Sequence, residues 1–291
     1  MSCLVKRSLL LLFLIGSLAW SARADVVRGG NAEGPAIVFL PGLASHGELW
    51  TPWLNEYQSS HRTYVLTAPG FAGQPAIPEA GSYLAKLVAE VETALRADGV
   101  NGATIVGHSL GGLVALMLSA DAPDLVGKLL IVDSVPFLGG LFMPGLAPEM
   151  VALQAGQMAQ QMQNMPRDAF DAQQRMGLRR LALKTEFLPT LEAWSAASDQ
   201  ATIAAAFKET LSTDYRTQLA DISVPAIILA AHNAMMPFGQ EQLAATYRDQ
   251  YGALSNAEIR TVPDSAHFIM IDQPAAFSDA LADTLKEGTN Q

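Results

Sequence analysis

Residues 103–112 read ATIVGHSLGG, and this stretch decides how the chain is expected to fold. Residues 103–106 have a strand pattern, and the small and aliphatic residues from Leu110 onward suit a helix. Between them, residues 107–111 fit G-x-S-x-G, a motif that needs this strand-to-helix context. A serine on so sharp a turn has a strained backbone, and the residues two positions away on each side must lack a Cβ. The motif therefore predicts Ser109 as a nucleophile at a helix N-terminus, where backbone N–H groups can stabilise an oxyanion.

Short apolar runs alternate with helix-compatible stretches on both sides of this motif. The expected strands are residues 36–40, 63–66, 103–106, 128–132, 225–231 and 257–262. Such alternation predicts a mostly parallel sheet with crossover helices. Glycine-rich alternatives are disfavoured, because the chain has neither a Gly-Lys-Ser/Thr phosphate loop nor the G-x-G-x-x-G spacing after a strand.

The alternation stops from Ser134 to about Asp221. This segment is long, helix-compatible and rich in methionine (Met143, Met150, Met158, Met162, Met165 and Met176). We therefore expect a core domain formed by residues 25–133 and 222–291, with a helical cap inserted at residues 134–221. The methionines have two interpretations: they fill the core of the cap, or they form a flexible apolar lid over a hydrophobic substrate.

The first 24 residues are typical of a secretion signal. Lys6 and Arg7 precede an apolar run at residues 9–18, and Ala22-Arg23-Ala24 fits a cleavage site. The run is short for a bilayer and no stop-transfer charges follow it, so we expect no stable membrane anchor after cleavage. The single cysteine, Cys3, would leave with the signal. The sequence thus predicts an exported protein, periplasmic or secreted, without disulfides.

Charge and ligand chemistry exclude several classes of function. The net charge is −10, which argues against nucleic acid as a partner. There is no H-E-x-x-H motif, and no cysteine follows the signal, so no metal site is expected. We expect a small-molecule substrate and no cofactor.

Together these features make the chain resemble the α/β-hydrolase superfamily over most of its length after residue 24. Residues 38–43 (VFLPGL) are similar to the loop after the third strand of that fold, and residues 68–73 (APGFAG) to the loop after the next strand. The resemblance implies a mostly parallel α/β-hydrolase sheet with helices on both faces and an inserted α-helical cap. It also implies that the N–H groups of Leu43 and Leu110 form an oxyanion hole.

His267 is the expected general base. A serine hydroxyl needs a base whose pKa lies near the working pH, and histidine supplies one. Among the five histidines only His267 lies beyond the last predicted strand, in a loop similar to the family's histidine loop, and this gives the expected order of serine, acid and histidine. His108 and His61 are expected to be structural, whereas His46 and His232 are candidates for positions near the site.

The acid departs from the common family pattern. Most relatives place it after the penultimate strand, but here residues 232–237 (HNAMMP) contain no carboxylate. Some relatives place it at the end of the preceding strand, where this chain has Asp133, and Asp133 is the preferred assignment. An amide at Asn233 would fill the role only in part. Asn233, Asp264 and the absence of a third member remain open alternatives.

These residues predict a serine hydrolase that cleaves a carboxylic ester or lactone through an acyl-enzyme, with an apolar acyl group. Peptidase, C–C hydrolase and cofactor-free haloperoxidase chemistry remain open on the same fold. The empty acid position also leaves open a non-catalytic ligand-binding protein, although such a protein would need neither Ser109 nor His267.

Overall fold

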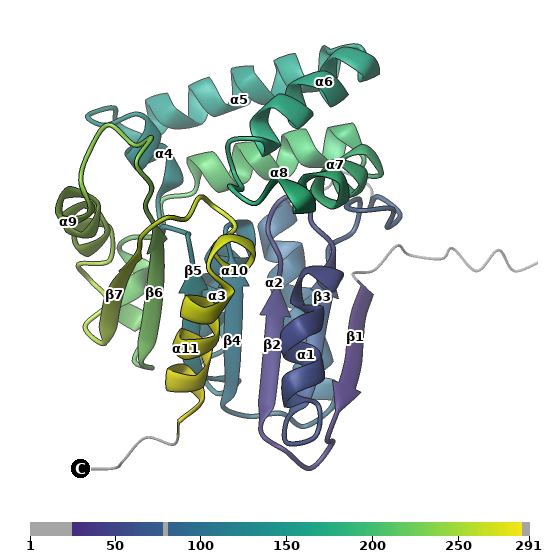
Figure 1. Cartoon of the computed structure of the whole chain (residues 1–291), viewed down its shortest axis with the longest axis vertical. Coiled ribbons are helices and arrows are strands. Elements are labelled where there is room, and N and C mark those ends of the chain that lie inside the picture. The colour runs from purple at the N-terminus through teal and green to yellow at the C-terminus, as the bar shows by residue number, and fades with distance from the viewer. Residues whose placement is uncertain (1–24, 78–80, 287–291) are drawn as a thin grey trace, which may run out of the picture.

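The computed structural model describes residues 25–77 and 81–286 (Figure 1). The expected secretion signal at residues 1–24 lies outside the described residues, as does Cys3.

A seven-stranded sheet forms the centre of the protein, in the order β1-β3-β2-β4-β5-β6-β7. The strands are β1 (Asp25–Gly30), β2 (Ala36–Leu40), β3 (Arg62–Thr67), β4 (Ala103–His108), β5 (Val126–Val132), β6 (Ala226–Ala231) and β7 (Ala257–Val262). Strands β2 to β7 are parallel to their neighbours, and only β1 pairs antiparallel, with β3. The predicted mostly parallel sheet is confirmed. Strand β1 was not expected, because it is short, largely exposed and ends in two glycines, so it lacks an apolar pattern.

Helices cover both faces of the sheet (Figure 1). On one face, α2 (Tyr83–Ala97), α3 (Leu110–Asp121) and α9 (Gln240–Gln250) bury their apolar residues against the strands. On the other face lie η1 (Gly47–Trp50), α1 (Thr51–Tyr57), α10 (Ile269–Asp272) and α11 (Pro274–Leu285), which pack around the rings of Trp50 and Phe277. Apolar burial on both faces explains why the central strands are continuous apolar runs.

The chain between β5 and β6 forms a separate helical layer (Figure 1). It consists of α4 (Leu138–Phe142), α5 (Pro148–Asn164), α6 (Arg167–Leu178), η2 (Thr185–Phe187), α7 (Leu188–Ala196), α8 (Gln200–Ser212) and η3 (Gln218–Asp221). We call α4 to α8 the cap. They lie over the edge of the sheet at which the parallel strands end (Figure 1), the edge where open α/β sheets bind ligands. No helix in residues 25–77 or 81–286 combines the length and apolarity needed to cross a membrane.

Candidate active site

Ser109 occupies the turn between β4 and α3 with a strained backbone. Its φ is 54° and its ψ is −120°, a conformation that residues with a Cβ rarely adopt. The turn is held by the Ser109 N–H, which donates to the carbonyl of Val132 (3.0 Å), and by the Ser134 hydroxyl, which donates to the carbonyl of Ser109 (2.7 Å). The strand end and the following loop therefore fix the serine at the carboxyl edge of the sheet.

The two motif glycines are required by close backbone contacts. A Cβ on Gly107 would clash with the carbonyl of Gly111, and a Cβ on Gly111 would clash with the carbonyl of Leu40 in the neighbouring strand. The next residue, Gly112, lies so close to Ser134 that a Cβ would be 2.6 Å from the Cβ of that serine. The absence of side chains thus lets α3 approach β2 and β5 and close the turn, as the motif predicts.

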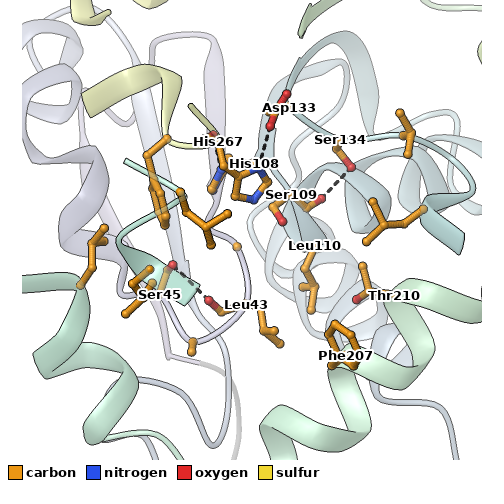
Figure 2. Close-up of a pocket in the computed structure, with 18 of the residues that line it drawn as sticks. Leu43, Ser45, His108, Ser109, Leu110, Asp133, Ser134, Phe207, Thr210 and His267 are labelled. Atoms are coloured by element: carbon orange, nitrogen blue, oxygen red, sulfur yellow. Dashed lines mark hydrogen bonds and ion pairs between the residues drawn. The ribbon is translucent and has the colours of Figure 1, made fainter. Parts of the chain in front are cut away.

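His267 and Asp133 form a short hydrogen bond, although they are 134 positions apart in the sequence. The Asp133 Oδ2 is 2.6 Å from the His267 Nδ1 (Figure 2). A carboxylate only accepts hydrogen bonds, so Nδ1 carries the proton and Nε2 keeps its lone pair. His267 follows β7, Asp133 follows β5, and both line the same cavity as Ser109. The structure thus brings together the three residues expected to act on the substrate.

Asp133 is held in place by two further donors. Its Oδ1 accepts from the backbone N–H of Ala231 (2.9 Å) and from the hydroxyl of Tyr247 (3.0 Å), and its φ is 45°. Burial and the neighbouring Asp133 charge raise the pKa of Tyr247 well above its usual value, so this hydroxyl stays protonated and donates. Sequence reasoning missed Tyr247, because nothing in the α9 pattern distinguishes it from an ordinary core tyrosine.

Leu43 and Leu110 are the two residues expected to form an oxyanion hole. Leu43 follows β2, Leu110 begins α3, and both line the cavity with Ser109 (Figure 2). Within the described ranges neither backbone N–H has a hydrogen-bond partner. The two donors are therefore available for an oxygen atom that develops negative charge.

Among the described residues, neither Asn233 nor Asp264, the alternative third triad members, hydrogen-bonds to the side chain of His267. Asn233 is 8% exposed, donates from Nδ2 to the carbonyl of Ser265 (3.1 Å) and accepts from the N–H of Met235 (3.0 Å). It thus anchors the loop after β6. Asp264 is exposed, and neither it nor Asn233 lines the cavity of Ser109.

Three other histidines have local roles. His46 accepts from the N–H of Glu48 (3.0 Å) and caps η1, His61 lies 2.8 Å from the Ser60 hydroxyl, and the His232 Nε2 lies 3.0 Å from the carbonyl of Phe238. None of them lines the cavity, although His46 directly follows Ser45, which does.

His108 is buried directly behind His267. Its Nε2 donates to the carbonyl of His267 (3.0 Å), and the two rings lie 4.5 Å apart. Burial, together with the nearby His267, lowers the pKa of His108 well below its usual value. A neutral His108 places no second positive charge beside His267, and its hydrogen bond fixes the histidine loop on the serine turn.

The cavity has a volume of about 290 Å³, at the lower end of the range for small-molecule sites. Its cap side is mostly apolar. The lining residues from the cap are Leu138, Leu141, Phe142, Gln174, Leu178, Leu181, Leu191, Ser195, Phe207 and Thr210.

The methionines of the cap do not contribute to this lining. None of the six lines the cavity; Met158 is 43% exposed and Met176 is 65% exposed, whereas Met162 and Met165 pack against the core. The lid interpretation of these residues is therefore wrong. Leucine and phenylalanine side chains form the apolar wall instead, and the sequence pattern alone did not show which helix faces would point inward.

Curated relatives match the chain over different lengths. A protein named "Putative carbamate hydrolase RutD" from Serratia proteamaculans is 26% identical over 258 residues, which cover 88% of this chain and 92% of the relative. A protein of the same name from Variovorax paradoxus is 33% identical over 106 residues, but the match spans only 40% of that protein. A pimeloyl-(acyl-carrier protein) methyl ester esterase from Aeromonas hydrophila is 32% identical over 121 residues, 41% of this chain and 46% of the relative.

Solved structures and a family model agree on the fold. A hydrolase from Pseudomonas aeruginosa PA01 superimposes with a TM-score of 0.74 at 21% identity and covers 90% of this chain and 94% of its own. The enol-lactonase from Burkholderia xenovorans LB400 gives 0.72 at 19% identity, with coverage of 91% and 96%. The model of the alpha/beta hydrolase family matches residues 37–280, and this chain belongs to that family.

Proposed function

We propose that this protein is a serine hydrolase that cleaves a carboxylic ester or lactone through an acyl-enzyme intermediate. The observation that carries the proposal is the 2.6 Å pair of Asp133 and His267 beside the strained Ser109, all three on one cavity. A purely structural role would require neither the strained serine nor a histidine paired with a carboxylate.

In the first step, the Ser109 Oγ attacks the substrate carbonyl while the Nε2 of His267 accepts its proton. The carbonyl oxygen gains negative charge, which the N–H groups of Leu43 and Leu110 stabilise. Asp133 stabilises the imidazolium and holds its ring in the required tautomer. His267 then gives the proton to the leaving alkoxide as the carbon–oxygen bond breaks, and an ester of Ser109 remains.

In the second step, His267 takes a proton from water, whose oxygen attacks the acyl-enzyme. The tetrahedral intermediate collapses, His267 returns the proton to the Ser109 oxygen, and the carboxylic acid leaves. No ion or cofactor is needed to balance either step.

The composition of the cavity supports an apolar acyl or lactone portion. Seven of its ten cap residues are leucine or phenylalanine, and the described lining contains no lysine or arginine. A substrate with a second carboxylate would lose its hydration in this cavity without a cationic partner. The names of the Aeromonas esterase and the Burkholderia enol-lactonase are compatible with this substrate class.

Ser109→Ala tests the nucleophile, because the substitution removes the attacking oxygen and little volume. We expect hydrolysis of a nitrophenyl ester to fall by several orders of magnitude at an unchanged melting temperature. A fluorophosphonate probe should label the wild type at Ser109, as mapped by peptide mass spectrometry, and should not label the variant.

The same probe separates the enzyme from a ligand-binding protein of this fold. Folded wild-type protein that takes up no label and hydrolyses no ester or lactone would favour the binding protein. The case for a binding protein rested on the missing carboxylate in the loop after β6. The pairing of Asp133 with His267 weakens that case, because Asp133 can serve as the acid instead.

We also propose that the protein is exported to the periplasm or secreted, on the basis of the charged and apolar pattern of residues 1–24. Expression of the full chain with a C-terminal tag, followed by cell fractionation and N-terminal sequencing, tests this. Mature protein that begins near Asp25 outside the cytoplasm is expected, and an intact N-terminus in the cytoplasmic fraction would contradict it.

A further inference from the structure

Two polar side chains interrupt the apolar wall that the cap presents to the cavity. Gln174 comes from α6 and Ser195 from α7, two helices that pack on each other. Thr210 is the third polar cap residue, but its hydroxyl already donates to the carbonyl of Ala206 (2.8 Å). Gln174 and Ser195 therefore differ from every other cap residue that lines the cavity.

Ser195 lacks a hydrogen bond that several helical hydroxyl groups in this protein make. A serine or threonine within a helix commonly donates to the carbonyl four residues earlier. Four helical residues do so, at 2.7–3.0 Å: Ser119, Thr210, Thr246 and Thr284. The Ser195 hydroxyl, in a residue only 6% exposed, makes no hydrogen bond within the described part of the chain.

The side-chain amide of Gln174 likewise has hydrogen-bonding groups that no other described residue uses. Its half-buried side-chain amide has no hydrogen-bond partner among the described residues. By contrast Gln200, also in the cap, donates to the carbonyls of Met162 (2.7 Å) and Met165 (2.9 Å). When an apolar substrate displaces water from the cavity, the Gln174 amide and the Ser195 hydroxyl lose their hydration and gain nothing in return. Both would regain a partner if the substrate carried a polar group.

The cap residues that line the cavity indicate whether the polar group of the substrate is charged. The cap residues that line the cavity include no acidic or basic side chain, and the titratable groups of the lining, such as Asp133 and His267, come from the core. A charged group near Gln174 would be desolvated without a counter-charge. The site suits an uncharged group that donates and accepts, because an amide and a hydroxyl each do both.

We infer that Gln174 and Ser195 form a polar subsite that recognises an uncharged hydrogen-bonding group, an amide or a hydroxyl, on an otherwise apolar acyl or lactone substrate. This inference rests on the proposed function and narrows its substrate class. A site built to bond a polar group discriminates against analogues that lack it, since its own polar atoms are then left unpaired.

Paired substrates test the subsite. Nitrophenyl octanoate is compared with esters of the same length in which an amide replaces two methylenes at successive positions along the chain. The measured quantity is the ratio of kcat/KM for each amide ester to that for octanoate. We expect the wild type to favour the amide at one position, and Gln174→Met to lower that ratio roughly threefold to tenfold. Ser195→Ala, which removes one oxygen atom, should lower it in the same direction.

The matched control is Gln173→Met. Gln173 belongs to the same helix, is exposed and does not line the cavity, so the ratio should stay at the wild-type value. The subsite would be overturned if all three proteins hydrolysed octanoate and gave the same kcat/KM ratio at every amide position. The three proteins are the wild type, Gln174→Met and Ser195→Ala. Failure of the wild type to hydrolyse any ester or to take up the fluorophosphonate label would instead overturn the proposed function.

Discussion

Among the residues that the structure describes, those with a Cβ and a strained backbone lie at one edge of the sheet. In residues 25–77 and 81–286, the residues other than glycine with positive φ are Ala44, Ala72, Ser109, Asp133 and Asp264. Each lies in the loop that follows a parallel strand, respectively β2, β3, β4, β5 and β7. Strained residues cluster at functional sites, where the surrounding structure holds them in place. The strain thus coincides with the edge that carries the proposed nucleophile, acid and oxyanion donors.

At the residue scale, Asp133→Asn tests the acid. An asparagine retains the size of the aspartate but can donate to the His267 Nδ1 and hold the neutral ring in the wrong tautomer. We expect kcat to fall by roughly 10³- to 10⁴-fold, by analogy with the same change in serine proteases. Steady-state kinetics on a nitrophenyl ester, with the melting temperature recorded in parallel, measures the effect.

Asn233→Ala is the matched control, because Asn233 was the alternative third member. Its amide is buried and joins the loop after β6 to the histidine loop. The variant should lose about 1–3 kcal/mol of unfolding free energy and only a small part of its turnover. Near-wild-type activity in Asp133→Asn, combined with a large loss in a folded Asn233→Ala, would show that the acid is misassigned.

At the scale of the elements, the cap helices divide into a packing helix and lining helices. Helix α5 buries Val151, Ala155 and Ala159, and it packs along α8. Small residues at this spacing let the two helices approach closely. The methionines of α5 therefore lie away from the cavity, whereas α4, α6, α7 and α8 supply its lining.

Phe207→Ala should consequently change chain-length preference. Phe207 projects from α8 into the cavity (Figure 2), and its truncation enlarges the space for an acyl chain. We expect the optimum in a series of nitrophenyl esters to shift toward longer chains. Met158→Ala, an equally drastic truncation outside the lining, should leave the optimum in place; a parallel shift in both variants would mean that cap stability, not cavity shape, sets the preference.

At the scale of the whole molecule, His108 connects the serine turn to the histidine loop across the sheet. Its low pKa in the folded state means that, below about pH 6.5, the unfolded chain binds a proton that the folded protein does not. Its contribution to the free energy of unfolding is therefore complete above that pH and declines as the pH falls toward the folded pKa.

Urea unfolding at pH 7.5 and pH 5.5 measures this contribution. The wild type should lose stability on acidification, by at most about 1.4 kcal/mol per pH unit from a single histidine. In His108→Gln, which retains a side-chain donor but does not titrate, the loss should be smaller. An identical loss in both proteins would place the acid sensitivity elsewhere.

The sequence determined the core of the fold because its signals are local. Alternating apolar strands and helices predict the parallel sheet, and the spacing of Gly107, Ser109 and Gly111 predicts the turn. The position of His267 after the last strand follows from chain order alone. The edge strand β1 lacked any such pattern and was visible only from its pairing with β3.

Tertiary structure decided what depends on residues far apart in the chain. The sequence offered Asp133, Asn233 and Asp264 as the third triad member. Only the parallel pairing of β5, β6 and β7 brings the ends of β5 and β7 to one edge of the sheet and places one carboxylate 2.6 Å from His267. Likewise the methionine content of the cap suggested a lid, but none of these methionines lines the cavity, whereas Gln174 of α6 and Ser195 of α7 do. Residue type sets what a side chain can do chemically, whereas its distance and direction to a partner arise from packing that no local pattern encodes.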